Sequence, residues 1–267
     1  MVGQEFCNCN EDLNFVIEKI ENKHPGFSIN VKDKSIEVYK SLKDSLIIKT
    51  NKDNLSKDEC QKIIKNYLSF IEDKHLQIYD PIKVKEAEYN KNFVAKNLPE
   101  YKDLESSTGY IKIPSFNYRL WKKLDNFYDS ITPIVKTKQK IILDIRNNGG
   151  GGERMYNQLL KILKSNSKKV KIAVVFNSKC ASACEEVALL LTENKRIKTF
   201  GENTNGQFAY GFIKEYKTPN CGFTFILTTK MYSDRLKYEF IGVQPEFILE
   251  KDKESDWIKI IEKKLNE

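Results

Sequence analysis

Hydrophobic side chains in the first eighty residues recur at the spacing of an α-helix. Two stretches carry this pattern: Leu13, Val16, Ile17 and Ile20, and then Ile63, Ile64, Tyr67, Leu68 and Ile71. Positions three and four apart fall on one helical face, so each stretch predicts an amphipathic helix. Ser56 and Glu59 stand where a capping box would start the second helix. We therefore predict a small helical module over residues 1–80.

From Gly109 onward, short β-forming runs alternate with amphipathic stretches. Strands are expected at 110–113, 141–145 and 170–176, with helices at 121–131, 155–163 and 183–191. After Arg196 the pattern favours strands at 212–216, 223–228 and 245–249, followed by a helix at 257–265. This alternation predicts an α/β layered core over residues 109–267. Residues 77–107 are Lys-rich and weakly patterned, which fits a strand, a loop or a crossing linker, and we place a linker over residues 81–108.

Composition and charge restrict the function. The chain has 45 Lys and Arg against 37 Asp and Glu, a net charge of +8, but the basic residues are interleaved with acids. A solvated surface explains this better than nucleic-acid binding does. The sequence has no apolar run of the roughly 18 to 20 residues that a membrane-spanning helix needs. It has neither a zinc-type Cys/His spacing nor a phosphate-binding loop, so we expect no metal and no cofactor.

The cysteine count bears on the cellular compartment. The six cysteines are Cys7, Cys9, Cys60, Cys180, Cys184 and Cys221. In an exported protein this even set could form up to three disulfides of undetermined pairing, and free buried thiols are the alternative. The first four residues lack the basic and apolar segments of a signal peptide, so such a peptide was either removed or never present.

Two strand-to-helix turns carry the candidate chemistry. The predicted strand 141–145 runs into a turn that contains Gly149 and Gly150, and backbone N–H groups at such a turn can stabilise developing negative charge. The alternative is a flexible turn that needs positive φ angles. The strand that ends at Phe176 leads to Ser182, flanked by Ala181 and Ala183. Ser182 could be a nucleophile at a helix N-terminus or simply a helix cap.

Four segments, taken in order, resemble the C-terminal processing (tail-specific) serine peptidases. They are Leu-Asp-Ile-Arg-Asn-Asn-Gly-Gly-Gly at 143–151, Cys-Ala-Ser-Ala-Cys-Glu at 180–185, Phe-Gly-Glu-Asn-Thr-Asn-Gly at 200–206, and Gly-Val-Gln-Pro-Glu at 242–246. The resemblance covers about 109–249 and implies that Ser182 is the nucleophile. It also implies a crotonase-like β/α spiral core, and the short segment between His75 and Gly109 indicates that the PDZ domain common in this family is absent.

The resemblance also suggests the base and its acid partner. The best-known branch uses a Ser-Lys dyad, but Gln207 stands at the lysine position, and an amide cannot accept the serine proton. His75 resembles the histidine of the tricorn-core and interphotoreceptor-retinoid-binding branch, which uses Ser, His and Glu, and Glu239 matches its glutamate. The implied triad is Ser182, His75 and Glu239. An oxyanion hole would come from the N–H groups of Gly149 or Gly150 and of Ala183.

Some residues near these motifs depart from the family pattern or receive a structural interpretation. Lys74 and Leu76 replace the small neighbours of the family's histidine. We expect Cys180 and Cys184 to be packed or disulfide-bonded, because Ser182 occupies the nucleophile position. Glu185 is interpreted as a first-turn acid favoured by the helix dipole. His24 is interpreted as structural.

The sequence therefore predicts a serine endopeptidase that acts on peptides or unfolded proteins in the periplasm or outside the cell. A lipoprotein anchored ahead of these residues is an alternative, and the oligomeric state is left open. Two other functions remain under consideration: a noncatalytic ligand- or peptide-binding module on the same fold, and an acyl-ester or acyl-CoA hydrolase. The absence of a basic cluster beside the glycines weighs against the acyl-CoA alternative.

Overall fold

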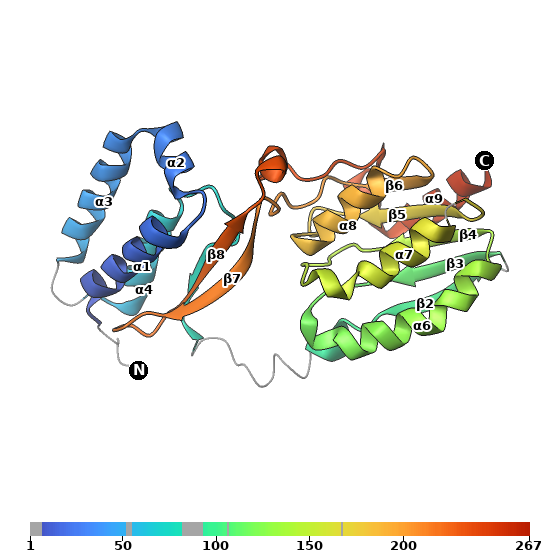
Figure 1. The fold of residues 1–267 in the computed structure, drawn as a ribbon, viewed down its shortest axis with the longest axis horizontal. Helices are drawn as coiled ribbons and strands as arrows, with labels where there is room; N and C mark the ends of the chain where they lie inside the picture. The colour runs from blue at the N-terminus through green and yellow to red at the C-terminus, as the bar shows by residue number, and fades with distance from the viewer. Residues whose placement is uncertain (1–6, 52–54, 82–92, 106, 167) are drawn as a thin grey trace. The chain divides into compact units, whose positions relative to one another are not determined.

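The computed structural model describes residues 7–51, 55–81, 93–105, 107–166 and 168–267. The chain forms two compact units, each described here by itself (Figure 1). Unit 1 comprises Met1–Glu86 and Ala209–Leu236, and unit 2 comprises Ala87–Phe208 and Lys237–Glu267. No helix in the described part of the chain is long and apolar enough to cross a membrane.

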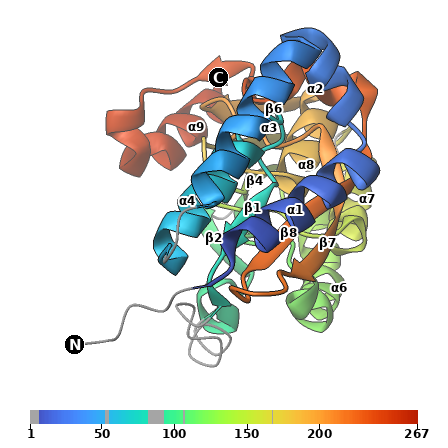
Figure 2. The ribbon, with the colours of Figure 1, turned by 90° about the vertical axis from the view of Figure 1, so that its left-hand side faces the viewer.

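Unit 1 packs four helices against a small antiparallel sheet. The helices are α1 (Cys9–Lys23), α2 (Phe27–Lys34), α3 (Ile36–Thr50) and α4 (Lys57–Leu68), and the strands are β1 (Gln77–Tyr79), β7 (Tyr210–Lys217) and β8 (Thr224–Met231). The strand order is β1-β8-β7, with Ile78 opposite Phe225. Helices α1, α3 and α4 pack on one another (Figure 2). The predicted capping box is present, because Glu59 and Ser56 exchange hydrogen bonds at the start of α4.

The buried side chains of unit 1 form one core that joins the two separate chain segments. Leu13 and Ile20 of α1 meet Ile64 of α4, Phe225 of β8 and Phe223 in this core. The helical module predicted for residues 1–80 thus shares its core with residues from the β7–β8 hairpin. Burial of this common apolar surface stabilises both segments together.

Unit 2 is built on a six-stranded sheet in the order β2-β3-β4-β5-β6-β9. The strands are β2 (Glu100–Glu105), β3 (Thr108–Lys112), β4 (Lys140–Asp144), β5 (Lys171–Phe176), β6 (Ile197–Gly201) and β9 (Phe247–Ile248). Strand β2 is antiparallel to β3, and the other neighbours are parallel. The fold is therefore mixed α/β, as the alternating pattern predicts.

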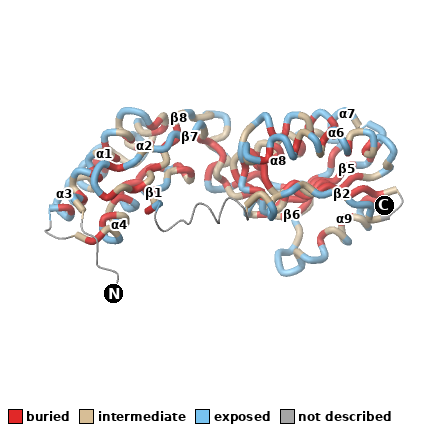
Figure 3. Tube along the Cα trace, turned by 90° about the horizontal axis from the view of Figure 1, so that it is seen from below, coloured by how far each residue is buried: buried red, intermediate tan, exposed pale blue. Residues whose placement is uncertain are grey.

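Helices cover both faces of this sheet, which explains why its inner strands read as continuous apolar runs. The helices are α6 (Trp121–Thr137), α7 (Asn157–Asn166), α8 (Ala183–Thr192) and α9 (Trp257–Asn266). Leu143 and Val174 face the core shared with α6, α7 and α8, whereas Ile142 and Val175 face Trp257 of α9. Buried residues accordingly follow the strands and the inward faces of the helices (Figure 3).

The observed division of the chain differs from the predicted boundaries in two places. Residues 209–236, predicted within the core, belong to unit 1, because β8 pairs with β1 and β7 pairs with β8. The predicted linker 81–108 contains β2, whose residues 100–105 pair with β3 as part of the unit 2 sheet. The stretch 82–85 lies outside the described residues. Pairing of β8 with the distant β1 decides the first boundary, which local patterning cannot reveal, whereas β2 forms a hairpin with β3, the next strand along the chain.

Candidate active site

Ser182 lies in a sharp turn between β5 and α8. Its backbone has φ 55° and ψ −119°, a conformation that costs free energy for a residue with a side chain. Two hydrogen bonds hold this backbone: the Ser182 N–H donates to the Gln207 carbonyl at 3.1 Å and to Glu185 Oε2 at 2.9 Å. The turn places Ser182 immediately ahead of the first residue of α8, at the positive end of the helix dipole. This strained strand-to-helix position is typical of a nucleophile.

A disulfide joins Cys180 to Cys184 across this turn. Both cysteines are fully buried, and neither is a free thiol. The expectation that they are bonded rather than reactive is confirmed. The bond closes a short loop around Ser182 and so restrains the residue on either side of the nucleophile position.

The Glu185 carboxylate accepts four hydrogen bonds, which come from the serine turn and from the 204–207 loop. It is fully buried, and its Oε1 accepts from Thr204 Oγ1 at 2.6 Å and from the Gly206 N–H at 2.7 Å. Its Oε2 accepts from the N–H groups of Ser182 and Gln207 at 2.9 and 2.8 Å. Burial raises the pKa of Glu185, against the lowering effect of these four donors. The residue therefore ties the 204–207 loop to the serine turn, a larger role than that of a first-turn acid.

The glycine turn after β4 lies directly against the serine turn. The Ala181 N–H donates to the Asn148 carbonyl at 3.0 Å. A Cβ atom added at Gly150, where φ is +93°, would lie 3.0 Å from Ser182 Cβ and 3.1 Å from the Ala183 nitrogen. The structure thus brings Gly150, Ser182 and Ala183 together, and only a residue without a side chain permits this approach.

The N–H groups of this region differ in their hydrogen bonding. The Gly150 N–H donates to Asn148 Oδ1 at 2.9 Å, while the Asn148 Nδ2 donates to the Ile113 carbonyl at 2.9 Å. No described residue accepts a hydrogen bond from the N–H of Gly149 or of Ala183. Asn148, which the sequence interpretation did not single out, therefore orients the turn, and Gly149 rather than Gly150 retains an N–H that could bind an oxyanion.

Glu239 directly follows the 310 helix η4 (Ser233–Tyr238) and is buried, with 8% of its surface exposed. Its Oε2 accepts a hydrogen bond from the Phe208 N–H at 2.8 Å. The next residue, Phe240, has a positive φ of 64° and donates its N–H to the Gly206 carbonyl at 2.8 Å. Glu239 is thus tied to the 206–208 segment, whose Gln207 holds the Ser182 backbone.

His75 belongs to unit 1, in the segment between α4 and β1. It is buried, with 3% exposed. Its backbone N–H and its ring Nδ1 both lie within hydrogen-bond distance of Asp73 Oδ1, at 2.7 and 3.2 Å. The structure therefore gives His75 a carboxylate partner that the sequence interpretation did not assign. The signal available was the short Asp-x-His spacing.

His24 occupies a buried structural position in unit 1, as expected. The Gly26 N–H donates to its Nδ1 at 3.2 Å, so the ring proton is on Nε2, which lies 3.1 Å from Asp73 Oδ2. The ring also packs against Tyr210, with 5.1 Å between centroids. These contacts occupy both ring nitrogens.

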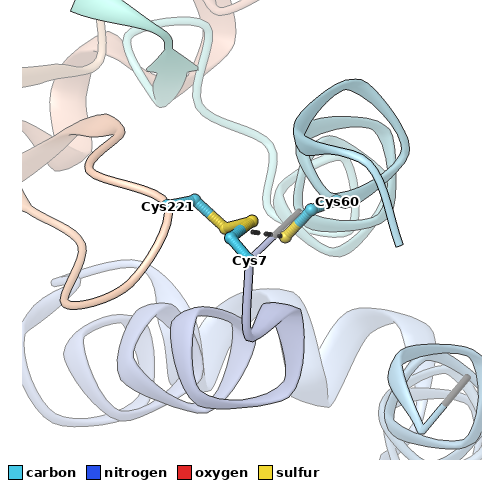
Figure 4. A group of neighbouring side chains, drawn as sticks. All are labelled: Cys7, Cys60 and Cys221. Carbon is cyan, nitrogen blue, oxygen red and sulfur yellow. Dashed lines mark hydrogen bonds between the residues drawn. A yellow bond between two sulfur atoms is a disulfide. The ribbon is translucent and has the colours of Figure 1, made fainter. Parts of the chain in front are cut away.

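The remaining four cysteines form a tight sulfur cluster in unit 1. The Sγ atoms of Cys7, Cys60 and Cys221 lie within 4.8 Å of one another, a spacing that could suit a thiolate metal site (Figure 4). However, Cys7 is bonded to Cys221 and Cys60 to Cys9, and a disulfide sulfur is not a thiolate ligand. With these bonds in place, the cluster consists of two neighbouring covalent links, one from the residues just ahead of α1 to the β7–β8 turn and one from α1 to α4.

An α/β sheet with a strained serine at a helix N-terminus, beside turn N–H groups that donate to no described residue, is an arrangement typical of serine hydrolases. The sequence matches the protein family described as "Peptidase family S41" over residues 107–164 and 152–249, which together make up more than half of the chain. The chain therefore belongs to peptidase family S41, and the predicted resemblance is confirmed. No curated protein matches the chain in sequence.

Solved structures share the fold at low sequence identity. A lipoprotein from Streptococcus agalactiae is 20% identical with a TM-score of 0.64, covering 95% of this chain and 96% of its own. The photosystem II D1 C-terminal processing protease is 12% identical with a TM-score of 0.57, covering 91% and 93%. The tricorn protease is 13% identical with a TM-score of 0.63, and the match covers 97% of this chain but 37% of that one. These likenesses support the fold.

Proposed function

We propose that this protein is a serine endopeptidase that hydrolyses peptide bonds of peptides or unfolded proteins. Ser182 attacks the scissile carbonyl, His75 accepts its proton and later passes it to the leaving amine, and Glu239 stabilises the imidazolium. The observation that carries the proposal is the strained Ser182 backbone at the N-terminus of α8, beside the Ala183 and Gly149 N–H groups that donate to no described residue.

The oxyanion site in this proposal consists of the Ala183 and Gly149 N–H groups. Gly150 contributes by letting the two turns approach, since its own N–H is bound to Asn148. Fixed backbone donors at this place stabilise the negative charge of a tetrahedral intermediate, an effect worth about 3 to 4 kcal/mol per donor in serine peptidases. The core that supports them is proposed to be the crotonase-like β/α spiral of the family.

We also propose that the protein works outside the cytoplasm, in the periplasm or as a secreted or lipid-anchored protein. All six cysteines form disulfides, namely Cys7–Cys221, Cys9–Cys60 and Cys180–Cys184. Structural disulfides persist mainly in oxidising compartments. The Streptococcus agalactiae lipoprotein that shares the fold agrees with such a location.

The test is mass-spectrometric detection of peptides released from reduced casein, with Ser182→Ala compared against wild type. The matched control is Ser130→Ala, which removes an exposed hydroxyl on α6 that bonds only locally to Phe127. We expect peptides from wild type and from Ser130→Ala, and a fall of at least about 10³-fold for Ser182→Ala and for His75→Gln. Equal release by wild type and Ser182→Ala would contradict the assignment, and no release by wild type would favour a binding module.

A further inference from the structure

The Asp73 carboxylate in unit 1 connects the two histidines of the chain. The sequence contains only His24 and His75, and Asp73 bonds to both rings, with Oδ2 on His24 and Oδ1 on His75. Asp73 is buried, with 5% exposed, and so are both rings. A carboxylate without water around it is stable only when donors satisfy its oxygens.

Four donors satisfy this carboxylate. Oδ2 accepts from His24 Nε2 and from the Thr228 hydroxyl, and Oδ1 accepts from the His75 N–H at 2.7 Å and from its Nδ1. Burial acts to raise the pKa of Asp73, but the hydrogen bonds from His24 and His75 outweigh it and hold the pKa below its ordinary value. Asp73 is therefore a fixed negative charge at neutral pH.

A fixed anion at Nδ1 determines which nitrogen of His75 carries the proton. An ionised carboxylate can only accept, so Nδ1 must be the protonated ring nitrogen and Nε2 the basic one. The donors from His24 and Thr228 hold the carboxylate in place from its other side. His24, whose Nδ1 accepts from Gly26, has the opposite tautomer.

We propose that Asp73 is a positioning residue that fixes the tautomer and ring orientation of His75, so that Nε2 accepts the serine proton. This inference rests on the proposed function, in which His75 is the base. It gives His75 a second acidic residue, Asp73 in unit 1, besides Glu239, which the family resemblance suggests. Orientation of a catalytic imidazole by a buried acid accounts for about 10⁴ in turnover in a serine peptidase of another fold.

A purely structural role for Asp73 makes a different prediction. The backbone bond from the His75 N–H needs only an oxygen acceptor, which the amide of Asp73→Asn also provides. The Nδ1–H bond is different, because an amide carries no charge and can present its NH₂ group to the ring and favour the other tautomer. Asp73→Asn therefore distinguishes a residue that only accepts the backbone hydrogen bond of His75 from a residue that also sets the tautomer of the His75 ring.

The first test is long-range ¹H–¹⁵N NMR of the imidazole rings in the full chain, where only two rings contribute signals. In wild type we expect one ring protonated at Nδ1 and one at Nε2, and His24→Gln identifies which signal belongs to His75. An Nε2-protonated His75 in wild type would overturn the proposal without any need for an Asp73 variant. An unchanged His75 tautomer in folded Asp73→Asn would overturn it as well.

The second test is the peptide-release assay. We expect Asp73→Asn to lower kcat by about 10²-fold or more with little change in KM, because substrate binding does not use the tautomer. Thr228→Val, which keeps the charge but removes one donor, should have a much smaller effect. Full kcat in Asp73→Asn would overturn the proposal. If wild type has the expected tautomer but releases no peptide, the proposed function fails while the positioning by Asp73 stands.

Discussion

At the scale of single residues, the candidate site depends on side chains that hold backbone in place. Ser182 supplies the candidate nucleophile, but Glu185 and Asn148 give the surrounding turns their shape through hydrogen bonds to backbone groups. A strained backbone persists only where neighbouring groups determine it. Two substitutions at this scale test that dependence.

Glu185→Gln should loosen the serine turn. The amide offers one accepting oxygen in place of two, so a pair of the four present donors loses its acceptor inside the core. At about 1 to 3 kcal/mol for each unsatisfied buried group, we expect a loss of roughly 2 to 6 kcal/mol in the free energy of unfolding, with reduced turnover. Urea unfolding measures the loss.

The control for this variant is Glu193→Gln at the exposed C-terminal end of the same helix. It should change the free energy of unfolding by less than about 0.5 kcal/mol. Equal effects of the two substitutions would show that the buried hydrogen bonds of Glu185 do not stabilise the protein more than an exposed glutamate does.

Gly150→Ala and Gly149→Ala should differ in their effect on stability and turnover, although the two residues are adjacent. A Cβ at Gly150 would lie 2.6 Å from the Ala181 carbonyl oxygen with φ at +93°, whereas a Cβ at Gly149 would meet nothing within 4 Å. We expect Gly150→Ala to lose about 1 to 3 kcal/mol of stability and most turnover. Gly149→Ala keeps its N–H and should remain close to wild type. Full turnover in Gly150→Ala would contradict the role of Gly150 in letting the two turns approach.

At the scale of elements, three disulfides join parts of the chain at very different separations. Cys7–Cys221 spans 214 residues, Cys9–Cys60 spans 51, and Cys180–Cys184 spans four. Each acts within a single unit. Cys7–Cys221 fixes the residues just ahead of α1 to the β7–β8 turn, and Cys9–Cys60 fixes α1 to α4. The short link restrains the turn at Ser182.

Removing the disulfides one pair at a time, with alanine in place of both cysteines, should lower stability in the order of loop length. Loop-closure entropy gives about 5 kcal/mol for Cys7–Cys221, about 4 for Cys9–Cys60 and about 2 for Cys180–Cys184. Denaturant unfolding of the three double variants measures this order. The largest loss from the shortest loop would mean that local restraint, rather than chain entropy, governs their contribution.

At the scale of the whole molecule, the chain leaves unit 2 after Phe208, forms the β7–β8 hairpin in unit 1, and returns at Lys237. The hairpin is tied to α1 by more than apolar packing. The Asp12 carboxylate accepts hydrogen bonds from the Thr218 hydroxyl and from the N–H groups of Asn220 and Cys221. Residues 1–86 therefore have an incomplete core by themselves.

A polypeptide of residues 1–86 should unfold without cooperativity, because it lacks the strand partner of β1 and the disulfide partner of Cys7. Residues 1–86 joined by a flexible linker to residues 209–236 should melt cooperatively, which circular dichroism on heating measures. Cooperative melting of residues 1–86 alone would show that the hairpin is dispensable and that the predicted boundary near residue 80 is the physical one.

Much of the local structure could be predicted from the sequence, because it depends on neighbours along the chain. The helical periodicity that includes Ile64 and Tyr67 predicted α4, and the spacing of Ser56 and Glu59 predicted its capping box. The apolar run at 141–145 predicted β4. The Gly-rich turn and Ser182 could be found for the same reason, since their motifs are contiguous. The family assignment follows from such segments taken in order.

Only the tertiary structure decided which distant groups meet. The placement of residues 209–236 in unit 1, the Cys7–Cys221 and Cys9–Cys60 bonds, and three of the four donors on Glu185 arise from contacts between remote segments. The carboxylate that contacts His75 in its own unit is likewise held by His24 and Thr228, 49 and 155 residues away. Sequence patterns report which face of an element is buried, whereas hydrogen-bond partners are chosen by the packing that buries them.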